Sequence, residues 1–417
     1  PTAKNKMKKQ KIIISCGGTG GHIFPALEIA KSLQKKGSNL DILFIGAYGK
    51  MEMTQVPKVG FAIIGLWIQG IYRKSIIKNT LLPLKFFISL IHSFFILLKH
   101  RPLAVIGTGG FASFPVLYVA SFLKIKTYIQ EQNCYPGLAN RLLGKRVKKV
   151  FVAHDGMETF FPKNKILNFG NPVRKSLKIA TVSKQESREF FGLEPNTFTI
   201  LVVGGSLGAN PINEAIATFL GGGVNNDCSR RVHLFGETHP GRHPSYNMTS
   251  PDHTDKEAFN LNSFQFIWQT GSKDYEHFKH WDKLSNSNPH LRGFPKLSIH
   301  SFIDNMDMAY NAADIVVSRA GAIAIAEICF LSKASILIPS PFVTDNHQKK
   351  NAEYLQNKEA ALMVADNVSI SPLNLMRQIY PFTKDLASLH QMGKNAHSLF
   401  QYDAADEISN IVLKETT

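Results

Sequence analysis

The chain has 417 residues, 44% of them hydrophobic, so it is long enough for two domains that each bury a core. Its formal net charge of +17 favours an anionic partner, either a nucleotide or a phospholipid surface, and the lack of any zinc-finger or RNA-module signature disfavours nucleic acid. The four cysteines lie far apart and form no CxxC pair, which indicates a reduced, cytosolic compartment rather than a disulfide framework.

Six short apolar runs in the first half predict the strands of a parallel sheet that is covered on both faces. The expected strands are residues 12–15, 40–45, 61–64, 103–106, 127–129 and 150–153. Helix-length segments such as 25–36 and 114–123 separate these runs, and this alternation is typical of a doubly wound α/β fold. The first apolar run is too short for a signal peptide, so we expect the catalytic parts to lie in the cytoplasm.

Residues 76–98 form an apolar segment that approaches the length of a membrane span. Pro83, Lys85 and His92 interrupt it, and it lies between two expected strands of one sheet. The segment is therefore either a core helix of the first domain or a helix that also meets the bilayer surface, where its basic side chains would contact anionic headgroups. A true span is the least favoured interpretation.

The second half repeats the pattern after an expected domain boundary. Asn171 and Pro172 interrupt any helix, so we divide the chain into domains at 1–170 and 171–417. Strands are expected at 198–203, 231–235, 264–268, 297–301, 314–317 and 335–338, and helices at 210–219, 306–312, 322–330 and 348–356. A polar stretch near 221–263 predicts an insertion or loop, to which we assign no chemistry.

Three glycine-rich turns join an expected strand to the helix that follows: GGTGGH at 17–22, GTGGF at 107–111 and GGSLG at 204–208. Glycine lets the backbone approach a ligand, and the N–H groups that open a helix bind phosphate. No loop carries the Gly-Lys-Ser/Thr of a P-loop, and Ile23 stands where a dinucleotide fingerprint has its last glycine. ATP and NAD are therefore disfavoured, and a nucleotide-sugar held between two Rossmann-like domains is favoured.

Eight blocks, in one order between about residues 11 and 360, resemble the MurG family of UDP-N-acetylglucosamine:N-acetylmuramyl-(pentapeptide) pyrophosphoryl-undecaprenol transferases. They are GGTGGHIFPALEIA, GTGGFASFP, EQNCYPGLANRLL, GNPVR, VVGGSLGAN, SFIDNM, SRAGAIAIAEI and DNHQKKNAEYL. The resemblance implies an α/β fold of the GT-B type, in which two Rossmann-like, doubly wound domains face each other across a cleft. It also implies inverting transfer of N-acetylglucosamine (GlcNAc) from UDP-GlcNAc to the C4 hydroxyl of the N-acetylmuramic acid (MurNAc) of lipid I, giving lipid II for peptidoglycan.

The resemblance places the protein at the periphery of the cytoplasmic face of the bacterial plasma membrane. The implied partners are UDP-GlcNAc, lipid I, anionic phospholipid and a cell-wall synthesis complex that serves cell shape and division, with no nucleic acid. No cofactor and no metal are expected, because the sequence lacks an Asp-x-Asp cluster that would hold Mg²⁺.

His22 is the candidate catalytic base, because an imidazole titrates near neutral pH and this one follows the first glycine loop. The alternative is a histidine that only hydrogen-bonds the donor or caps the helix. Glu131 is either a residue that orients the Asn133 loop or a second candidate base. Gln130 stands where many family members have His, which puts an acid–base role at that position in doubt, and Phe111 stands where some relatives have Tyr.

The remaining family roles carry over to matching positions. Arg174 and Ser206 should contact the donor, Ser206 through the diphosphate, and Ile303 should hold uracil through its backbone. Glu327 should accept hydrogen bonds from the ribose hydroxyls, and Gln348 should contact the GlcNAc hydroxyls. The residues expected to line the donor site are Ala322, Ile323, Ala324, Ile325 and Ala326, with Thr19, Gly20, Gly21 and Asn133 approaching the sugar from the other side. The acceptor-side loop is Gly109, Gly110 and Phe111.

Three other functions remain open at this point. The chain could be a GT-B enzyme with another acceptor, such as a glycolipid or a polyprenyl-linked sugar. UDP-GlcNAc 2-epimerases share the architecture and the donor, and they would turn over UDP-GlcNAc without an acceptor. A membrane-associated UDP-sugar-binding scaffold would bind the donor tightly and transfer nothing.

Overall fold

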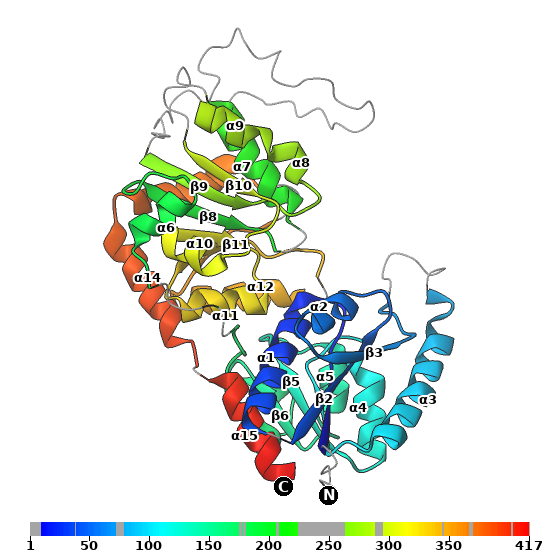
Figure 1. Cartoon of the computed structure of the whole chain (residues 1–417). Coiled ribbons are helices and arrows are strands. Elements are labelled where there is room, and N and C mark those ends of the chain that lie inside the picture. Colours follow the sequence, from blue (N-terminus) through cyan, green and yellow to red (C-terminus); the bar gives the residue numbers. More distant parts are fainter. Residues whose placement is uncertain are drawn as a thin grey trace, which may run out of the picture.

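The computed structural model describes residues 10–37, 39–71, 79–174, 177, 181–205, 208–223, 263–287, 295–343, 346–366, 370–401 and 403–416. They form two α/β domains, which lie one above the other in Figure 1. The expected strand at 231–235, nearly all of the polar stretch at 221–263, and Ser206 lie outside the described residues.

The first domain is built on a seven-stranded parallel sheet in the order β3-β2-β1-β4-β5-β6-β7. Its strands are β1 (Gln10–Ser15), β2 (Leu40–Ala47), β3 (Ala62–Leu66), β4 (Ala104–Gly107), β5 (Lys126–Glu131), β6 (Lys149–Val152) and β7 (Ile166–Asn168). Its helices are α1 (Gly20–Lys36), α2 (Glu52–Lys58), α3 (Leu82–His100), α4 (Ser113–Phe122) and α5 (Leu138–Leu143). Strand β1 is buried on both faces, because Ile13 packs with α4 while Ile12 and Ile14 pack with α1.

The second domain has a six-stranded parallel sheet in the order β10-β9-β8-β11-β12-β13. Its strands are β8 (Phe198–Val203), β9 (Phe264–Gln269), β10 (Leu297–His300), β11 (Ile315–Ser318), β12 (Ala334–Leu337) and β13 (Leu362–Met363). The helices of this half of the chain are α6 (Lys184–Phe190), α7 (Asn210–Gly223), α8 (Tyr275–Phe278), α9 (His280–Ser287), α10 (Met306–Ala312), α11 (Ala322–Phe330), α12 (His347–Asn357), α13 (Pro372–Ile379), α14 (Leu386–Ser398) and α15 (Ala404–Thr416).

Both sheets reverse their strand order beside their first strand, between β1 and β4 and between β8 and β11. Ligands of open α/β sheets bind at the carboxyl ends of the strands at such a reversal. The first two glycine loops follow β1 and β4, and the third follows β8. The topology therefore brings the three loops to the binding edges of their sheets.

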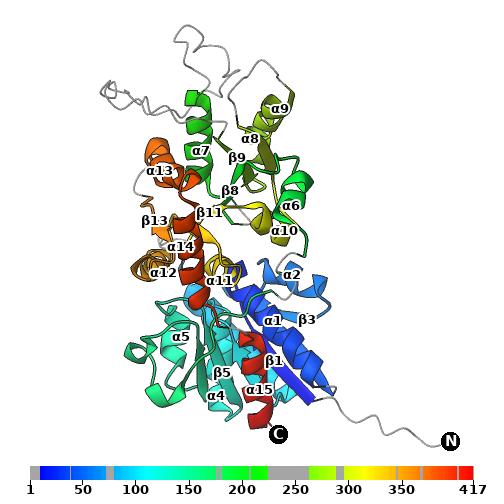
Figure 2. The ribbon, with the colours of Figure 1, turned by 90° about the vertical axis from the view of Figure 1, so that its left-hand side faces the viewer.

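The last helix, α15, returns to the first domain and packs along α1, as both views show (Figures 1 and 2). The Ser32 hydroxyl donates to the Asp406 carboxylate, and Lys36 Nζ donates to Asn410 Oδ1 at 2.5 Å. The expected second domain, 171–417, thus includes a helix that packs on the first. The chain crosses between the domains twice, near residue 171 and again near residue 401.

Candidate active site

The first two glycine loops lie against each other. Gly109 and Gly110 have positive φ angles of 101° and 81°, and a Cβ on Gly110 would meet the Gly17 carbonyl oxygen at 2.1 Å. Only glycine permits this backbone and this approach. The Phe111 ring covers Gly18, where a Cβ would lie 3.2 Å from the ring. The expected acceptor-side loop therefore packs directly on the first glycine loop.

A carboxylate that the sequence analysis missed holds the first loop in place. Glu52, at the start of α2, is fully buried. Its Oε2 accepts from the Gly18 amide at 3.2 Å, and its Oε1 accepts from the Ala47 amide at 2.9 Å. Charge-assisted bonds of this kind are stronger than neutral ones, so Glu52 ties the loop to the end of β2.

His22 lies on the first turn of α1, because the helix begins at Gly20 rather than at the expected residue 25. Proline usually opens a helix, but here Pro25 is buried inside one, and Gly20 and Gly21 form the extra turn before it. Thr19 precedes the helix in an extended conformation, with φ −146° and ψ 157°, and is exposed. The extra turn carries His22 to the second glycine loop.

The surroundings of the His22 ring select one tautomer. Its Nδ1 lies 3.0 Å from the Thr108 carbonyl oxygen and 3.0 Å from Gln132 Oε1. Both partners are acceptors, so Nδ1 carries the proton and Nε2 keeps the lone pair. A neutral imidazole with a lone pair on Nε2 is the form that a general base requires.

Glu131 organises the loop that follows β5. This carboxylate is buried, and its Oε1 accepts from the backbone and side-chain amides of Asn133 at 3.0 and 3.1 Å. Its Oε2 accepts from the Gly137 amide at 3.1 Å and from Asn140 Nδ2 at 2.9 Å. With both oxygens engaged by donors, the geometry favours the orienting role of Glu131 over that of a second base. Asn133 is thereby presented toward the second domain.

Arg174 and Glu327 form a charged pair on the second-domain side. Arg174 Nε and Nη2 donate to Glu327 Oε1 at 2.9 and 2.7 Å, and the Tyr310 hydroxyl lies 3.4 Å from Glu327 Oε2. Burial raises the pKa of the Glu327 carboxyl, and Arg174 opposes this shift. The guanidinium also lies 5.3 Å from the centre of the Phe24 ring on α1. Arg174 therefore contacts both domains, and its first-domain partner, Phe24, lies two residues along the chain from His22.

The other donor-side residues gather around the binding edge of the second sheet. Helix α11 begins directly after Gly321, so Ala322, Ile323, Ala324, Ile325 and Ala326 form its first turns, and of these only Ala324 is not buried. The Ile303 amide donates to Gln269 Oε1 at 2.9 Å, and Gln269 Nε2 donates to the Gly205 carbonyl oxygen at 3.1 Å. Gln269, which the sequence analysis also missed, thus links the expected uracil segment to the third glycine loop. Gln348 Oε1 accepts from the Ser340 amide at 2.9 Å.

Asn351 on α12 joins the two sides of the site. This fully buried residue donates through Nδ2 to Asn133 Oδ1 at 3.1 Å and to the Ala320 carbonyl oxygen at 3.2 Å, and its Oδ1 accepts from the Cys134 amide at 3.0 Å. Ala320 lies just before α11. The bonds of Asn351 therefore connect the loop after β5 to the residues that open α11.

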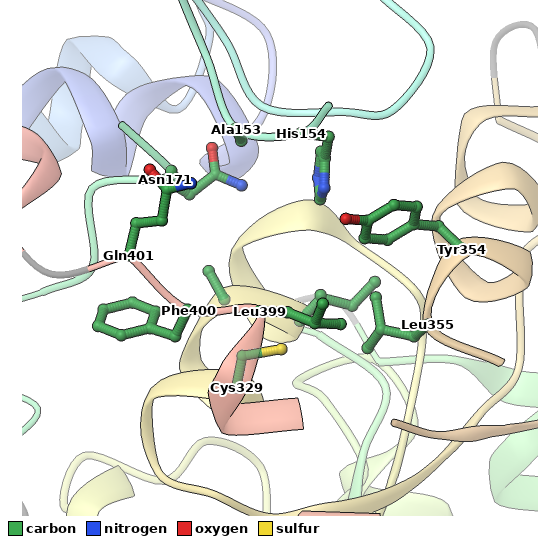
Figure 3. Close-up of a pocket in the computed structure, with 12 residues that line it drawn as sticks. Ala153, His154, Asn171, Cys329, Tyr354, Leu355, Leu399, Phe400 and Gln401 are labelled. Carbon is green, nitrogen blue, oxygen red and sulfur yellow. The ribbon is translucent and has the colours of Figure 1, made fainter. Parts of the chain in front are cut away.

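A small cavity lies between the two chain crossings (Figure 3). It is lined by Ala153, His154, Gly170, Asn171, Ile325, Ala326, Cys329, Tyr354, Leu355, Leu399, Phe400 and Gln401. The His154 ring meets that of Tyr354 edge-on at 5.1 Å, and its buried Nε2 has no hydrogen-bond partner among the described residues. Burial lowers the pKa of His154 to about 4, so this imidazole is neutral at physiological pH.

We expect acid to destabilise the protein through His154. The unfolded chain takes up this proton near pH 6.5 and the folded chain only near pH 4, so stability falls as pH drops through that window. Between pH 7.5 and 5 the loss should be about 2 kcal/mol, at about 1.4 kcal/mol per unit of pKa. Urea unfolding of the wild type and of His154→Gln measures it, with exposed His390→Gln as control. Equal acid sensitivity in all three proteins would contradict the assignment.

Within the described ranges, no three His, Cys, Asp or Glu side chains gather in a way that could hold a metal ion.

Comparison with known proteins identifies the family. Residues 12–152 match the glycosyltransferase family 28 N-terminal domain, and residues 199–408 match the glycosyltransferase family 28 C-terminal domain. A Flavobacterium psychrophilum protein is 39% identical over 98% of both chains, and it is named UDP-N-acetylglucosamine--N-acetylmuramyl-(pentapeptide) pyrophosphoryl-undecaprenol N-acetylglucosamine transferase. An Amoebophilus asiaticus protein of the same name is 40% identical over 96% of this chain and 99% of its own. The chain belongs to this family, that of MurG.

The fold of the MurG family is confirmed by solved structures. The crystal structure of Acinetobacter baumannii MurG is 24% identical, with a TM-score of 0.69 over 97% of this chain and 99% of that one. A UDP-GlcNAc 2-epimerase from Neisseria meningitidis, solved with UDP-GlcNAc bound, is 14% identical, with a TM-score of 0.61 over 97% and 100% of the two chains. These likenesses concern the fold alone, and they confirm the expected GT-B architecture of two doubly wound domains.

Proposed function

We propose that this MurG-family chain transfers GlcNAc from UDP-GlcNAc to the C4 hydroxyl of the MurNAc of lipid I, with inversion, and so forms lipid II. The observation that carries the proposal is the position of Arg174. It contacts Glu327 in the second domain and Phe24 in the first, so the donor-side pair lies next to the helical turn of His22. The proposed base, His22, and the proposed partner of the leaving group, Arg174, can therefore act on the same sugar.

In the proposed reaction, His22 Nε2 removes the proton from the acceptor C4 hydroxyl. The new C–O bond forms at the anomeric carbon as the bond from that carbon to the diphosphate oxygen breaks, and UDP leaves with the electron pair. The proton stays on His22 until it passes to solvent. Attack opposite the leaving group inverts the anomeric centre.

The charge on the departing UDP is stabilised by groups that the chain supplies. Arg174 Nη1 makes no hydrogen bond within the described residues and is available to the diphosphate. The N–H groups that open α11 add the positive end of a helix dipole. Ser206, in the third glycine loop, completes this proposed diphosphate site.

Because these groups meet the charge, we propose that no metal is required. We expect UDP release to continue unchanged when EDTA is present. Loss of activity in EDTA that Mg²⁺ restores would contradict the metal-free reaction.

The function itself is tested by the dependence of UDP release on the acceptor. With UDP-GlcNAc and a soluble lipid I analogue, we expect UDP and a disaccharide product in equal amounts. Turnover of UDP-GlcNAc that is the same without the analogue would favour an epimerase or a hydrolase instead. Donor binding with no turnover at all would favour a binding scaffold.

We also propose that helix α3 holds the protein at the cytoplasmic face of the membrane. Among the described helices, α3 alone is long and apolar enough to cross a bilayer by length and composition, yet it packs on α4 at the edge of the first domain (Figure 1). Its inward face carries Ser89, Ser93, Ile96 and Leu97. Its outward face is an exposed apolar stripe of Leu84, Phe87, Ile91, Phe95 and Leu98.

This stripe suits a helix that lies in the plane of the interface. Lys99 and Arg101 are exposed at the end of α3, and Lys124 is exposed at the end of the neighbouring α4. Such cations attract anionic headgroups, at roughly 1 kcal/mol each near the surface. The same face would bring the first domain, with its acceptor-side loop, to a lipid-linked acceptor.

We expect replacement of two stripe residues, Phe87→Ser and Phe95→Ser together, to weaken binding to anionic phospholipid vesicles at least tenfold. Each phenyl ring contributes about 1.5–3 kcal/mol when it is buried in an apolar phase. Vesicle co-sedimentation measures the change, and Phe342→Ser, at a residue 79% exposed in the second domain, is the control. If the control weakens binding equally, α3 is not the anchor.

A further inference from the structure

Three buried amide side chains connect the interdomain linker to His22. Gln130, Gln132 and Asn171 are 0%, 1% and 6% exposed. Gln130 and Gln132 lie where β5 ends, and Asn171 lies where the chain first crosses between the domains. A buried amide is costly unless all its hydrogen-bonding groups are satisfied, so the direction in which each amide points carries structural information.

The direction of the Gln132 amide is fixed by its neighbours. Its Nε2 lies 2.7 Å from the Thr108 carbonyl oxygen and 3.2 Å from the Gln130 carbonyl oxygen, and it also contacts Gln130 Oε1. Three acceptors surround this atom, so it is the nitrogen. Oε1 must therefore be the atom that faces His22 Nδ1.

The side chains of Gln130 and Asn171 complete this hydrogen-bond network. Gln130 Nε2 donates to Asn171 Oδ1 at 3.0 Å, and Asn171 Nδ2 donates to the Gln132 carbonyl oxygen at 3.0 Å. If Gln130 were turned over, its nitrogen would face the nitrogen of Gln132 and its oxygen would face the oxygen of Asn171. The three amides therefore support one another in a single arrangement, which ends at the Nδ1 of His22.

Asn171, the member of this hydrogen-bond network that belongs to the interdomain linker, lies at the domain junction. Gly170, which precedes Asn171, has a φ of 78°, and Pro172 follows. Asn171 also lines the cavity between the two chain crossings. A change in the course of the linker would move Asn171 and, with it, the partner of Gln130.

We propose that Gln132, aligned by Gln130 and Asn171, is a positioning residue that holds His22 with its proton on Nδ1 and its lone pair on Nε2. Gln132 supplies the second acceptor for Nδ1 and also anchors the first, the Thr108 carbonyl. The geometry of the base thus depends on the interdomain linker. The inference rests on the proposed role of His22 as the base, but its structural content can be measured without turnover.

The first test compares three buried glutamines. We expect Gln132→Met to lower kcat about 10- to 100-fold, the range seen when an orienting partner of a functional histidine is lost, while KM for UDP-GlcNAc changes less than about twofold. Gln130→Met, which does not touch His22, should lower kcat about tenfold. Gln265→Met removes a buried amide, 1% exposed, from the second domain and should leave kcat unchanged. Equal losses of kcat in all three variants would overturn the proposal.

The second test reads the tautomer directly by NMR of protein labelled with ¹⁵N at histidine, with the His22 signals assigned by their loss in His22→Ala. The wild type should show the proton on Nδ1, and Gln132→Met should add a population with the proton on Nε2.

A His22 tautomer that is the same in the wild type, Gln132→Met and Gln130→Met would overturn the proposal, as would a wild-type proton on Nε2. If instead the tautomers follow the prediction but no GlcNAc is transferred, the proposed function fails and the positioning role stands.

Discussion

Replacement of His22 by alanine is expected to lower kcat for GlcNAc transfer by about 10²- to 10⁴-fold, the usual contribution of a general base. The lone pair on Nε2 is the group that would accept the acceptor proton, and alanine leaves the C4 hydroxyl without a partner. The affinity for UDP-GlcNAc should change little, because the ring is held by the first domain through Thr108 and Gln132. Steady-state kinetics and calorimetric titration with UDP-GlcNAc separate the two effects.

The control for this substitution is His390→Ala, which removes an exposed histidine from α14 and should leave turnover intact. The alternative role, a histidine that only binds the donor, makes the opposite prediction. In that case His22→Ala would retain turnover at saturating donor while the affinity for UDP-GlcNAc falls. Such a result would remove His22 from the proton transfer.

Replacement of Arg174 by alanine is expected to lower kcat/KM by about 10²- to 10³-fold, as the loss of one transition-state donor does in other enzymes. Its contribution to UDP binding should be about 1.5–3 kcal/mol, or roughly 10- to 150-fold in Kd, the value of a hydrogen bond to a charged group. Arg174→Lys keeps the charge but not the fork that holds Glu327 through two nitrogens, so it should recover only part of the loss.

Loss of Arg174 also leaves the buried Glu327 carboxyl without its cation, and this affects folding as well as binding. The double variant Arg174→Ala with Glu327→Gln removes the unpaired charge. We expect it to regain melting temperature but to bind UDP more weakly than Glu327→Gln alone, which loses the same ribose contact. If the double variant binds UDP as tightly as Glu327→Gln, Arg174 supports the fold and does not contact the diphosphate.

Much of the sheet framework could be predicted from the sequence. The expected strand at 198–203 and the helices at 306–312 and 322–330 coincide with β8, α10 and α11. β8 and α11 are mainly apolar and lie next to Gly204 and Gly321, and α10 begins directly after Asn305, so the local pattern and the tertiary environment agree. β7 was not predicted, because it is a three-residue edge strand that is only partly buried and so carries no apolar run.

Helix α3 shows what a local pattern leaves open. The segment is apolar on nearly all sides, so its sequence does not tell which face packs inward. In the structure the small Ser89 and Ser93 side chains face α4, and this close packing leaves the larger Phe87 and Phe95 exposed. Only the position of α4 selects that face.

The candidate site likewise contains some residues that the sequence indicates and others that only the structure reveals. The glycine loops, His22 and the α11 segment could be chosen as candidates from the sequence, because they lie in continuous blocks. Glu52 and Gln269 could not, because each lies outside the eight blocks and bonds to a glycine loop 34 or 64 positions away. Asn351 lies within the last block, DNHQKKNAEYL, but nothing in that block indicates that it bonds to residues 217 and 218 positions away. Parallel-sheet topology, rather than any local motif, brings these partners together.

The central claim is that both domains act on one UDP-sugar. His22 removes the proton from the acceptor hydroxyl on one side of the sugar, and Arg174 stabilises the departing diphosphate on the other. The most direct measurement is the anomeric configuration of the disaccharide made from UDP-GlcNAc and a lipid I analogue, determined by NMR. UDP-GlcNAc has an α linkage, so the account predicts a β linkage to the C4 oxygen of MurNAc. An α-linked disaccharide, or UDP-GlcNAc consumed with no disaccharide formed, would contradict it.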